Sequence, residues 1–197
     1  MKLLLATGNE HKARELSALL GGVRLELATL KEFPAVPPVV EDGRTLVENA
    51  VKKALEPAMA TGLWTLADDT GLEVEALGGR PGVLSARYAG PGCDFAANCR
   101  KLLEELEGVP LQNRKAAFRT VVALAAPDGR VQCREARLEG RITTSPVGKN
   151  GFGYDPIFYL PDEGRTLAQL SDEDKNALSH RALAVKAMRS VLEDLAR

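Results

Sequence analysis

The sequence predicts a single compact domain, undivided or split into two lobes, in which strands and helices follow one another along the chain. The 197 residues are 45% apolar and 27% charged, a composition that allows a full hydrophobic core without metals or disulfides. Short apolar runs alternate with segments in which apolar residues recur at helical spacing. No internal repeat, low-complexity tract or linker interrupts residues 1–197.

The first predicted elements are a strand, a polar loop and a helix. Residues 2–7 form an apolar run, residues 7–12 are polar, and apolar residues then recur at helical spacing as far as Leu20. Two glycines at 21–22 end this helix, and the alternation over residues 23–27 predicts a half-buried strand.

A second helix is predicted after a proline-containing loop over residues 29–44. Thr45 and Glu48 have the spacing of a capping box and precede a run with one apolar face. Because Pro57 lacks a backbone N–H, we expect this helix to kink or stop near Glu56.

Two carboxylates are predicted at a break between strands. Residues 63–67 and 72–76 both resemble strands, and Asp68, Asp69, Thr70 and Gly71 separate them. After a turn over residues 78–82, the pattern predicts the helix and the hairpin that follow. The helix starts near Asp94, and the hairpin strands cover residues 116–126 and 131–138.

The C-terminal part combines a glycine-rich loop with a helix. Residues 145–156 contain too many glycines and prolines for regular structure, yet they include Phe152, Tyr154 and Asp155, which favours a functional loop. From Ser171 onward the spacing of apolar residues predicts one long amphipathic helix reaching Leu195.

Charge and hydropathy exclude several classes of protein. The chain carries 26 Lys and Arg against 27 Asp and Glu, whereas proteins that bind a nucleic-acid backbone usually have a basic excess. No apolar run approaches the roughly 20 residues that span a bilayer, and the N-terminal run is too short for a signal peptide. We therefore expect a soluble cytoplasmic protein without nucleic-acid or membrane partners.

The cysteines indicate neither a disulfide framework nor a zinc site. Cys93, Cys99 and Cys133 contain no CxxC pair, and the chain has only two histidines. We expect all three cysteines to be reduced and partly buried. The motifs of P-loop, Rossmann, zincin and serine-hydrolase proteins are also missing.

The polar segments that remain have two interpretations each. The loop over residues 7–12 provides helix N-terminal amides and a lysine for an anion, or it is an ordinary capped turn. The carboxylates of Asp68, Asp69, Glu41 and Glu48 suit Mg²⁺, or they are solvated acids. Phe152, between two glycines, stacks on a base or packs in the core.

Six motifs taken together, in order and over essentially the whole chain, resemble the inosine/xanthosine triphosphate pyrophosphatase family, the Ham1-like enzymes. They are Thr7-Gly8-Asn9-x-x-Lys12, Glu48-Asn49-Ala50-x-x-Lys53-Ala54, Ala67-Asp68-Asp69-Thr70-Gly71-Leu72, Pro81-Gly82-x-x-Ser85-Ala86-Arg87-Tyr88, Gly151-Phe152-Gly153-Tyr154-Asp155-Pro156-Ile157-Phe158 and Ser179-His180-Arg181.

The resemblance implies a fold and an activity. The expected fold is α/β, a long curved mixed β-sheet with flanking helices that form two lobes around a central substrate cleft. The expected enzyme is a Mg²⁺-dependent homodimer that hydrolyses non-standard purine nucleoside triphosphates (ITP, dITP, XTP) to the monophosphate and pyrophosphate, cleansing the nucleotide pool.

The resemblance also assigns site residues. Asp69 is the expected catalytic carboxylate and a metal ligand, with Glu41 as the second metal carboxylate and Asp42 or Glu48 as alternatives. The expected substrate-binding residues are Thr7, Gly8, Asn9, Glu10, His11, Lys12, Lys53, Thr70, Phe152, Gly153, Tyr154, Asp155, Lys175, His180 and Arg181.

The chemistry of these residues agrees with the implied reaction. Lys12, Lys53, Lys175 and Arg181, together with Mg²⁺, would balance the phosphate charges, so no nucleophilic side chain is needed. Water would attack the α-phosphorus, oriented by Asp69 as a base or through the metal. Hydrogen bonds to a 6-oxo purine would reject ATP and GTP.

Two other readings remain open at this stage. One is a Maf-like pyrophosphatase for pyrimidine or modified nucleotides, although its usual N-terminal motif differs from residues 6–9. The other is a non-catalytic nucleotide- or RNA-binding module, which the balanced charge and the presence of Asp69 and Glu41 disfavour.

Overall fold

The computed structural model describes residues 1–92 and 94–197, so Cys93, one of the cysteines expected to be reduced, lies outside the described residues. The chain forms two compact units. The first comprises Met1–Asp69, Thr120–Ala136 and Arg181–Arg197, and the second comprises Thr70–Arg119 and Arg137–His180.

A mixed, open eight-stranded sheet confirms the predicted α/β class. Its order is β2-β1-β3-β5-β6-β7-β8, with β4 paired to β3. Parallel pairing joins β1 to β2 and β3, whereas β3–β4, β6–β7 and β7–β8 are antiparallel. The strands are β1 (Lys2–Leu5), β2 (Glu26–Thr29), β3 (Trp64–Val74), β4 (Pro81–Gly82), β5 (Lys115–Ala125), β6 (Val131–Ile142), β7 (Phe158–Leu160) and β8 (Arg165–Thr166).

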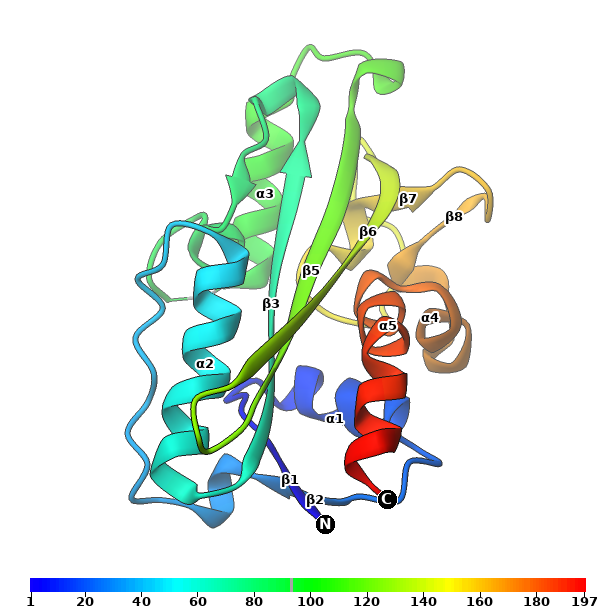
Figure 1. The fold of residues 1–197 in the computed structure, drawn as a ribbon. Coiled ribbons are helices and arrows are strands. Elements are labelled where there is room, and N and C mark those ends of the chain that lie inside the picture. Colours follow the sequence, from blue (N-terminus) through cyan, green and yellow to red (C-terminus); the bar gives the residue numbers. More distant parts are fainter. Residues whose placement is uncertain (93) are drawn as a thin grey trace. The chain divides into compact units, whose positions relative to one another are not determined.

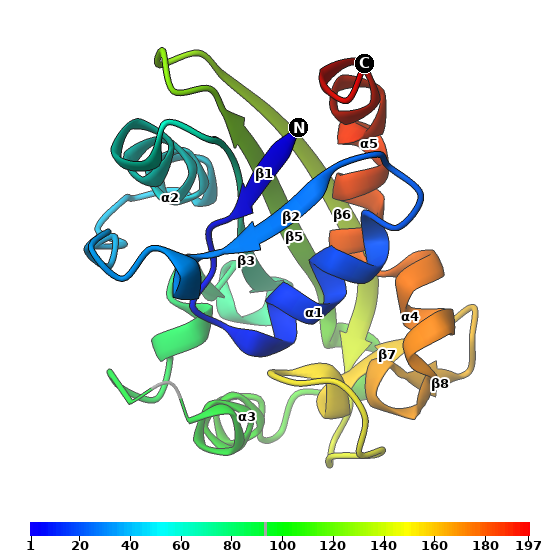
Figure 2. The same cartoon turned by 90° about the horizontal axis from the view of Figure 1, so that it is seen from below.

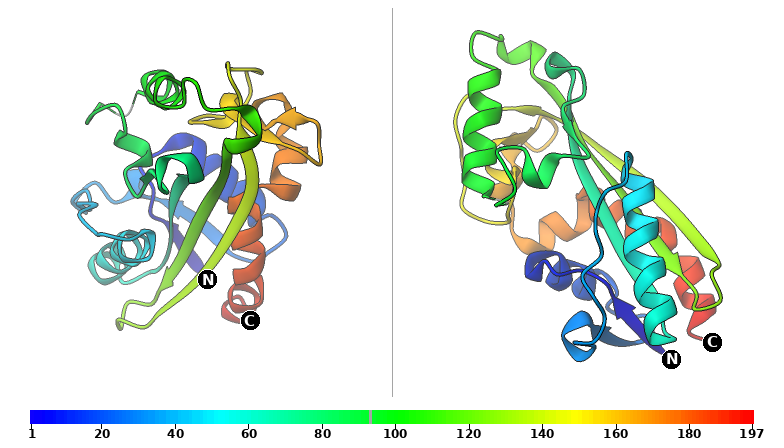
Figure 3. Two further views of the ribbon diagram at one scale, coloured as in Figure 1. Left: turned by 90° about the horizontal axis from the view of Figure 1, so that it is seen from above. Right: turned by 90° about the vertical axis from the view of Figure 1, so that its left-hand side faces the viewer.

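Helices cover both faces of the strands in the first unit. The helices are α1 (Glu10–Leu19), α2 (Leu46–Thr61) and α5 (His180–Leu195). Leu16 of α1 and Met188 of α5 pack in one core cluster with Leu3, Leu66 and Val122 of the strands. Helix α2 lies on the opposite side of these strands (Figures 1, 2 and 3).

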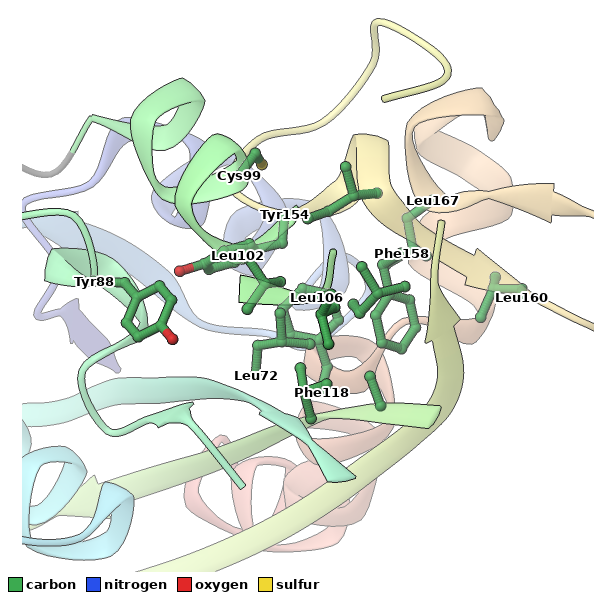
Figure 4. Close-up of a cluster of buried hydrophobic side chains, with 14 of the residues drawn as sticks. Leu72, Tyr88, Cys99, Leu102, Leu106, Phe118, Tyr154, Phe158, Leu160 and Leu167 are labelled. Carbon is green, nitrogen blue, oxygen red and sulfur yellow. The ribbon is translucent and has the colours of Figure 1, made fainter. Parts of the chain in front are cut away.

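The second unit has its own core, built around helix α3 (Phe95–Glu105) and the short helix α4 (Asp172–Leu178). Figure 4 shows Leu102 of α3 among the aromatic side chains of Tyr154, Phe118 and Phe158, all of which belong to this cluster. Across both units, the short 3-10 helices are Leu30–Glu32, Glu75–Leu77, Ser85–Arg87, Leu111–Asn113, Asp155–Ile157 and Leu167–Gln169.

The predicted break at Asp68 and Asp69 is wrong. Strand β3 runs without interruption from Trp64 to Val74, and both carboxylates lie inside it. Aspartate and glycine are depleted in strands because they offer little side-chain packing. Here ion pairs to neighbouring helices stabilise the buried carboxylates, so tertiary contacts override the local preference.

Of the kink or stop predicted near Glu56, the stop is wrong, because α2 continues through Pro57 to Thr61. Pro57 and Ala58 are both buried, so the helix gains packing that offsets the lost N–H of the proline. Gly62 ends the helix at a φ of 71°, in the left-handed region that glycine favours.

The prediction of one long C-terminal helix is wrong, because the structure has two helices there, α4 and α5. Ser179, with extended torsions, separates α4 from α5, and its amide donates to the carbonyl of Lys175 at 2.8 Å. Serine favours helix ends over helix interiors, because its hydroxyl competes for backbone hydrogen bonds. Lys175 and the His180-Arg181 pair therefore belong to different helices.

The remaining elements agree with the prediction apart from their bounds. Pairing with β1 starts at Glu26, so β2 begins three residues later than the alternation suggested. Strand β6 reaches Ile142, and the short strands β7 and β8 had no clear sequence signal. Among the described residues, no helix has the length and apolar character needed to cross a membrane.

Candidate functional site

Two adjacent aspartates organise the site in the first unit. Successive side chains of a strand point to opposite faces, so Asp68 and Asp69 of β3 face different helices. Asp68 contacts Lys12 of α1 and Arg181 of α5, whereas Asp69 contacts Lys53 of α2. The alternation of a strand thus gives two neighbouring carboxylates two different surroundings.

Asp68 is the centre of a buried ion-pair cluster. Its Oδ2 lies 3.0 Å from Lys12 Nζ, and Arg181 donates to the same oxygen from Nε and Nη2 at 3.2 and 3.1 Å. Arg181 also pairs with Glu15, one helical turn beyond Lys12. Burial opposes ionisation of Asp68, but the cations around it outweigh burial and hold its pKa well below the ordinary value.

Asp69 has a different environment. Lys53 Nζ lies 2.8 Å from Asp69 Oδ1 and 3.1 Å from Glu41 Oε2, so one ammonium group joins the two carboxylates. Asn49 Nδ2 lies 3.4 Å from Asp69 Oδ2, and Asn49 Oδ1 accepts from the amide of Gly43. Burial raises the pKa of Asp69 despite the nearby lysines, as suits a proton acceptor.

The three carboxylates considered as the second metal ligand have different partners in the structure. Glu41 shares Lys53 with Asp69, whereas Asp42 pairs with Lys52 and Glu48 accepts from the amide of Arg44. Glu41 and Asp69 thus converge on one cation position. No group of three or more His, Cys, Asp or Glu side chains placed to hold a metal occurs within residues 1–92 and 94–197. Two carboxylates fit Mg²⁺, which commonly takes its other ligands from water and phosphate oxygens.

The ion pairs of this cluster leave no excess of positive charge. The three cations Lys12, Lys53 and Arg181 pair with the four carboxylates of Glu15, Glu41, Asp68 and Asp69. Arg181 and Lys175, two of the four cations expected to balance a polyphosphate, each have a buried carboxylate partner. The cluster by itself therefore offers no net positive charge to a polyanion.

The loop before α1 is a capped turn. Asn9 is the N-cap, and its Oδ1 accepts from the amides of His11 and Lys12 at 2.9 and 3.2 Å. Thr7 Oγ1 accepts from the amide of Asn9 at 3.2 Å. In the described part of the chain the amides of Gly8 and Glu10 have no acceptor, so these two N–H groups remain for an anion.

The side chains of this loop differ in exposure. Glu10 pairs with Lys31 at the surface, and His11 Nδ1 lies 3.1 Å from Arg14 Nη2. Lys12 alone turns inward, to Asp68. The loop therefore combines two open amides with one partly buried ammonium group.

The glycine-rich loop of residues 145–156 belongs to the second unit. Asp155 Oδ2 accepts from Lys175 Nζ at 2.7 Å and from the amide of Phe152 at 2.8 Å. The same ammonium lies 4.9 Å from the centre of the Phe152 ring. Gly151 has a φ of 73°, and a Cβ there would collide with the Asp155 carboxylate, so glycine is required.

The remaining predicted base-side residues are mostly buried. Tyr154 packs in the core of the second unit, and its hydroxyl donates to the carbonyl of Ser85 at 2.9 Å. The His180 ring stacks on Phe118 with 4.5 Å between centroids. Phe152 is half-buried and outside the core cluster, so the core-packing alternative does not hold for it. Thr70, half-buried, follows Asp69 on β3.

Sequence reasoning missed three residues of the first unit's cluster. The sequence offers Asp68 only as one of four carboxylates suited to Mg²⁺, not as the partner of Lys12 and Arg181, and Asn49 only as part of a motif. Glu15 carried a usable signal, because its position three residues after Lys12 places both on one face of α1. The pairing of Asp68 with Arg181, 113 residues away, had no signal in one sequence.

A sequence model of the Ham1 family matches residues 3–191. The chain belongs to the Ham1 family. This finding confirms the resemblance inferred from the six motifs. Similar proteins named dITP/XTP pyrophosphatase occur in Desulforamulus reducens and Geobacter sulfurreducens. Both are 49% identical to the chain; the first match covers 99% of it and 97% of the relative, the second 97% and 96%.

Solved structures of Ham1 proteins have the same fold as this chain. A HAM1 protein from Coxiella burnetii is 42% identical with a TM-score of 0.89, and the Ham1 protein of Staphylococcus aureus is 36% identical with a TM-score of 0.87. Each match covers 98% of this chain and 99% of the other chain.

We predict that Asp68→Asn destabilises the fold strongly. The variant leaves Lys12 and Arg181 buried beside a neutral amide, and breaking a buried ion pair costs about 3–5 kcal/mol. Urea unfolding at pH 7 measures the loss. Asp128→Asn, which removes an exposed partner of Arg130, is the control and should change stability little.

The same variant has a pH signature. The folded pKa of Asp68 lies below its ordinary value of 3.8, so the ionised group stabilises the fold fully above that value, and this contribution is lost as the pH falls below it. As the pH falls from 4 to 2, the wild-type protein should therefore lose stability more steeply than Asp68→Asn. Parallel curves would contradict the role assigned to Asp68.

Proposed function

We propose that this chain hydrolyses dITP, XTP and ITP to the nucleoside monophosphate and pyrophosphate, and so removes non-standard purine nucleotides. Its Ham1 relatives are named dITP/XTP pyrophosphatases, which makes a nucleoside triphosphate pyrophosphatase the class of this enzyme. One observation carries the proposal. Asp69, with a raised pKa, and Glu41 share the ammonium group of Lys53.

Mg²⁺ is the proposed cofactor, with Glu41 and Asp69 as its protein ligands. The support is the donor set, two carboxylates that already converge on a cation, and the lack of surplus positive charge in the cluster. When bound, the metal would supply charge neutralisation for the phosphate oxygens and the departing pyrophosphate.

The protein groups of the first unit would bind and orient the phosphates. The amides of Gly8 and Glu10 and the ammonium of Lys12 are donors suited to phosphate oxygens. Asp69 would accept a proton from the attacking water, and burial favours this role because it raises the carboxyl pKa. The hydrolysis then needs positioning and charge stabilisation but no covalent intermediate.

The glycine-rich loop would recognise the base. Phe152 has a half-buried ring that could stack on a base. Stacking does not distinguish one base from another, because every base has an aromatic face. Discrimination against ATP and GTP would come from hydrogen-bonding groups at the purine edge, among them Asp155, His180, Arg181 and backbone amides. Lys175 would hold Asp155 and Phe152 in place through the contacts described above.

The cytoplasmic location stays a prediction from the hydropathy pattern of the sequence, and the homodimer stays a prediction of the family resemblance. Oligomeric state is measured directly by sedimentation of the purified protein.

A panel of nucleoside triphosphates tests the proposed activity. With Mg²⁺, we expect pyrophosphate from ITP, dITP and XTP and at least 10²-fold less from ATP and GTP, because a purine edge with the wrong hydrogen-bonding groups leaves buried partners unpaired. Removing the metal with a chelator should abolish release, and adding Mg²⁺ should restore it. Orthophosphate instead of pyrophosphate would mean cleavage at the γ-phosphate and a different enzyme.

Asp69→Asn should lower kcat by several orders of magnitude. The amide removes the proton acceptor and one proposed metal ligand, while Asn49 and Lys53 keep a polar partner of the same shape. Circular dichroism and the midpoint of thermal unfolding check that the variant is folded. Turnover near the wild-type rate in a folded variant would remove Asp69 from the catalytic role.

Phe152→Ala should raise KM for dITP and leave kcat nearly unchanged. The base is remote from the reacting phosphorus, so loss of stacking weakens the ground state and the transition state alike. Stacking of a base on an aromatic ring corresponds to about a 5- to 150-fold change in affinity. An unfolded variant would instead assign Phe152 a structural role.

A further inference from the structure

Helix α3 contacts the glycine-rich loop along one face. One face of α3 begins at Phe95 and includes the residues three, four and seven positions later, which is the spacing of a single helix face. These residues are Asn98, Cys99 and Leu102. In Figure 4, Cys99 and Leu102 lie on the side of α3 that meets Tyr154. The helix is thus placed to fix the loop.

The backbone around Phe152 is anchored by α3. Cys99 Sγ donates to the carbonyl of Gly153, at 3.3 Å. The carbonyl of Ser85 accepts from Tyr154 Oη at 2.9 Å and lies 3.4 Å from Asn98 Nδ2. These contacts fix the main chain on the C-terminal side of Phe152 and leave the orientation of its ring to other groups.

The ring of Phe152 has an aromatic neighbour on the first residue of α3. The centroids of Phe95 and Phe152 are 5.8 Å apart, with an interplanar angle of 48°, within the range of favourable aromatic pairs. Lys175 Nζ is close to the same ring at 4.9 Å. Both phenylalanines are half-buried, and neither belongs to the core cluster of the second unit.

A pair of aromatic rings outside the core suggests a purpose other than stability. Phe95 is not a member of the core cluster of the second unit, and Asp94 caps α3 by accepting from the amide of Ala97. Removing the Phe95 ring therefore takes away little that the fold depends on. It does take away the aromatic neighbour of the Phe152 ring.

We propose that Phe95 is a positioning residue for the base: it holds the ring of Phe152 in the orientation that stacks on a purine. This inference rests on the proposed function, in which Phe152 contacts the base. Phe95 itself acts through Phe152 and has no part in the chemistry at the phosphorus atom.

The test is a double-mutant cycle on steady-state hydrolysis of dITP with Mg²⁺. Phe95→Ala should raise KM about 3- to 10-fold with kcat within about twofold of wild type, because an aromatic pair of this kind contributes that much to a binding constant. Phe95→Tyr, which keeps the ring, should restore the wild-type KM. In a Phe152→Ala background, adding Phe95→Ala should change KM less than about twofold.

Phe33→Ala is the matched control. Phe33 is also half-buried and also has a lysine near its ring, Lys2 at 5.9 Å, but it belongs to the first unit and lies outside the proposed site. Its KM should equal that of the wild type. Thermal unfolding of each variant checks that a change in KM does not come from loss of fold.

The outcomes separate this inference from the proposed function. If the wild type releases no pyrophosphate from dITP, XTP or ITP, both proposals fall. If the wild type is active and Phe95→Ala has a normal KM, only the role of Phe95 falls. The role of Phe95 also falls if Phe95→Ala raises KM equally in the wild-type and Phe152→Ala backgrounds. It falls as well if Phe95→Ala lowers kcat without changing KM.

Discussion

The burial of two adjacent carboxylates in one strand is the constraint on which the rest of the first unit depends. A buried, unpaired charge is prohibitively costly, so Asp68 and Asp69 require cations on both faces of β3. Helices on opposite faces meet this requirement, α1 and α5 with Lys12 and Arg181, and α2 with Lys53. The same ion pairs that make the strand possible also place the groups suited to phosphate and metal chemistry.

The sequence predicted elements wherever local pattern and tertiary packing agree. The hairpin of β5 and β6 and the N-cap at Thr45 are such cases. The prediction of secondary structure failed where long-range contacts determine the local conformation. Local propensity argues against Asp68 and Asp69 in a strand and against Pro57 in a helix, and both are stabilised by partners that a single sequence does not reveal.

The sequence offered candidate site residues but not the pairs that they form. The motifs identified Asp69, Lys53 and the glycine-rich loop, because their order and spacing match a family. Which carboxylate meets which cation depends on the register of β3 against three helices, so the contact of Glu41 with Lys53 could not be read from the sequence. Side-chain neighbours such as Phe95 carry no motif at all.

The bond from Cys99 to the Gly153 carbonyl has a consequence for redox chemistry. Burial raises the pKa of this thiol to about 11, so at neutral pH only roughly one molecule in ten thousand carries the reactive thiolate. Peroxide and disulfide reagents attack thiolates, and Cys99 is therefore a poor target for them. A cell under oxidative stress would retain this anchor of the loop without needing a reductant to regenerate it.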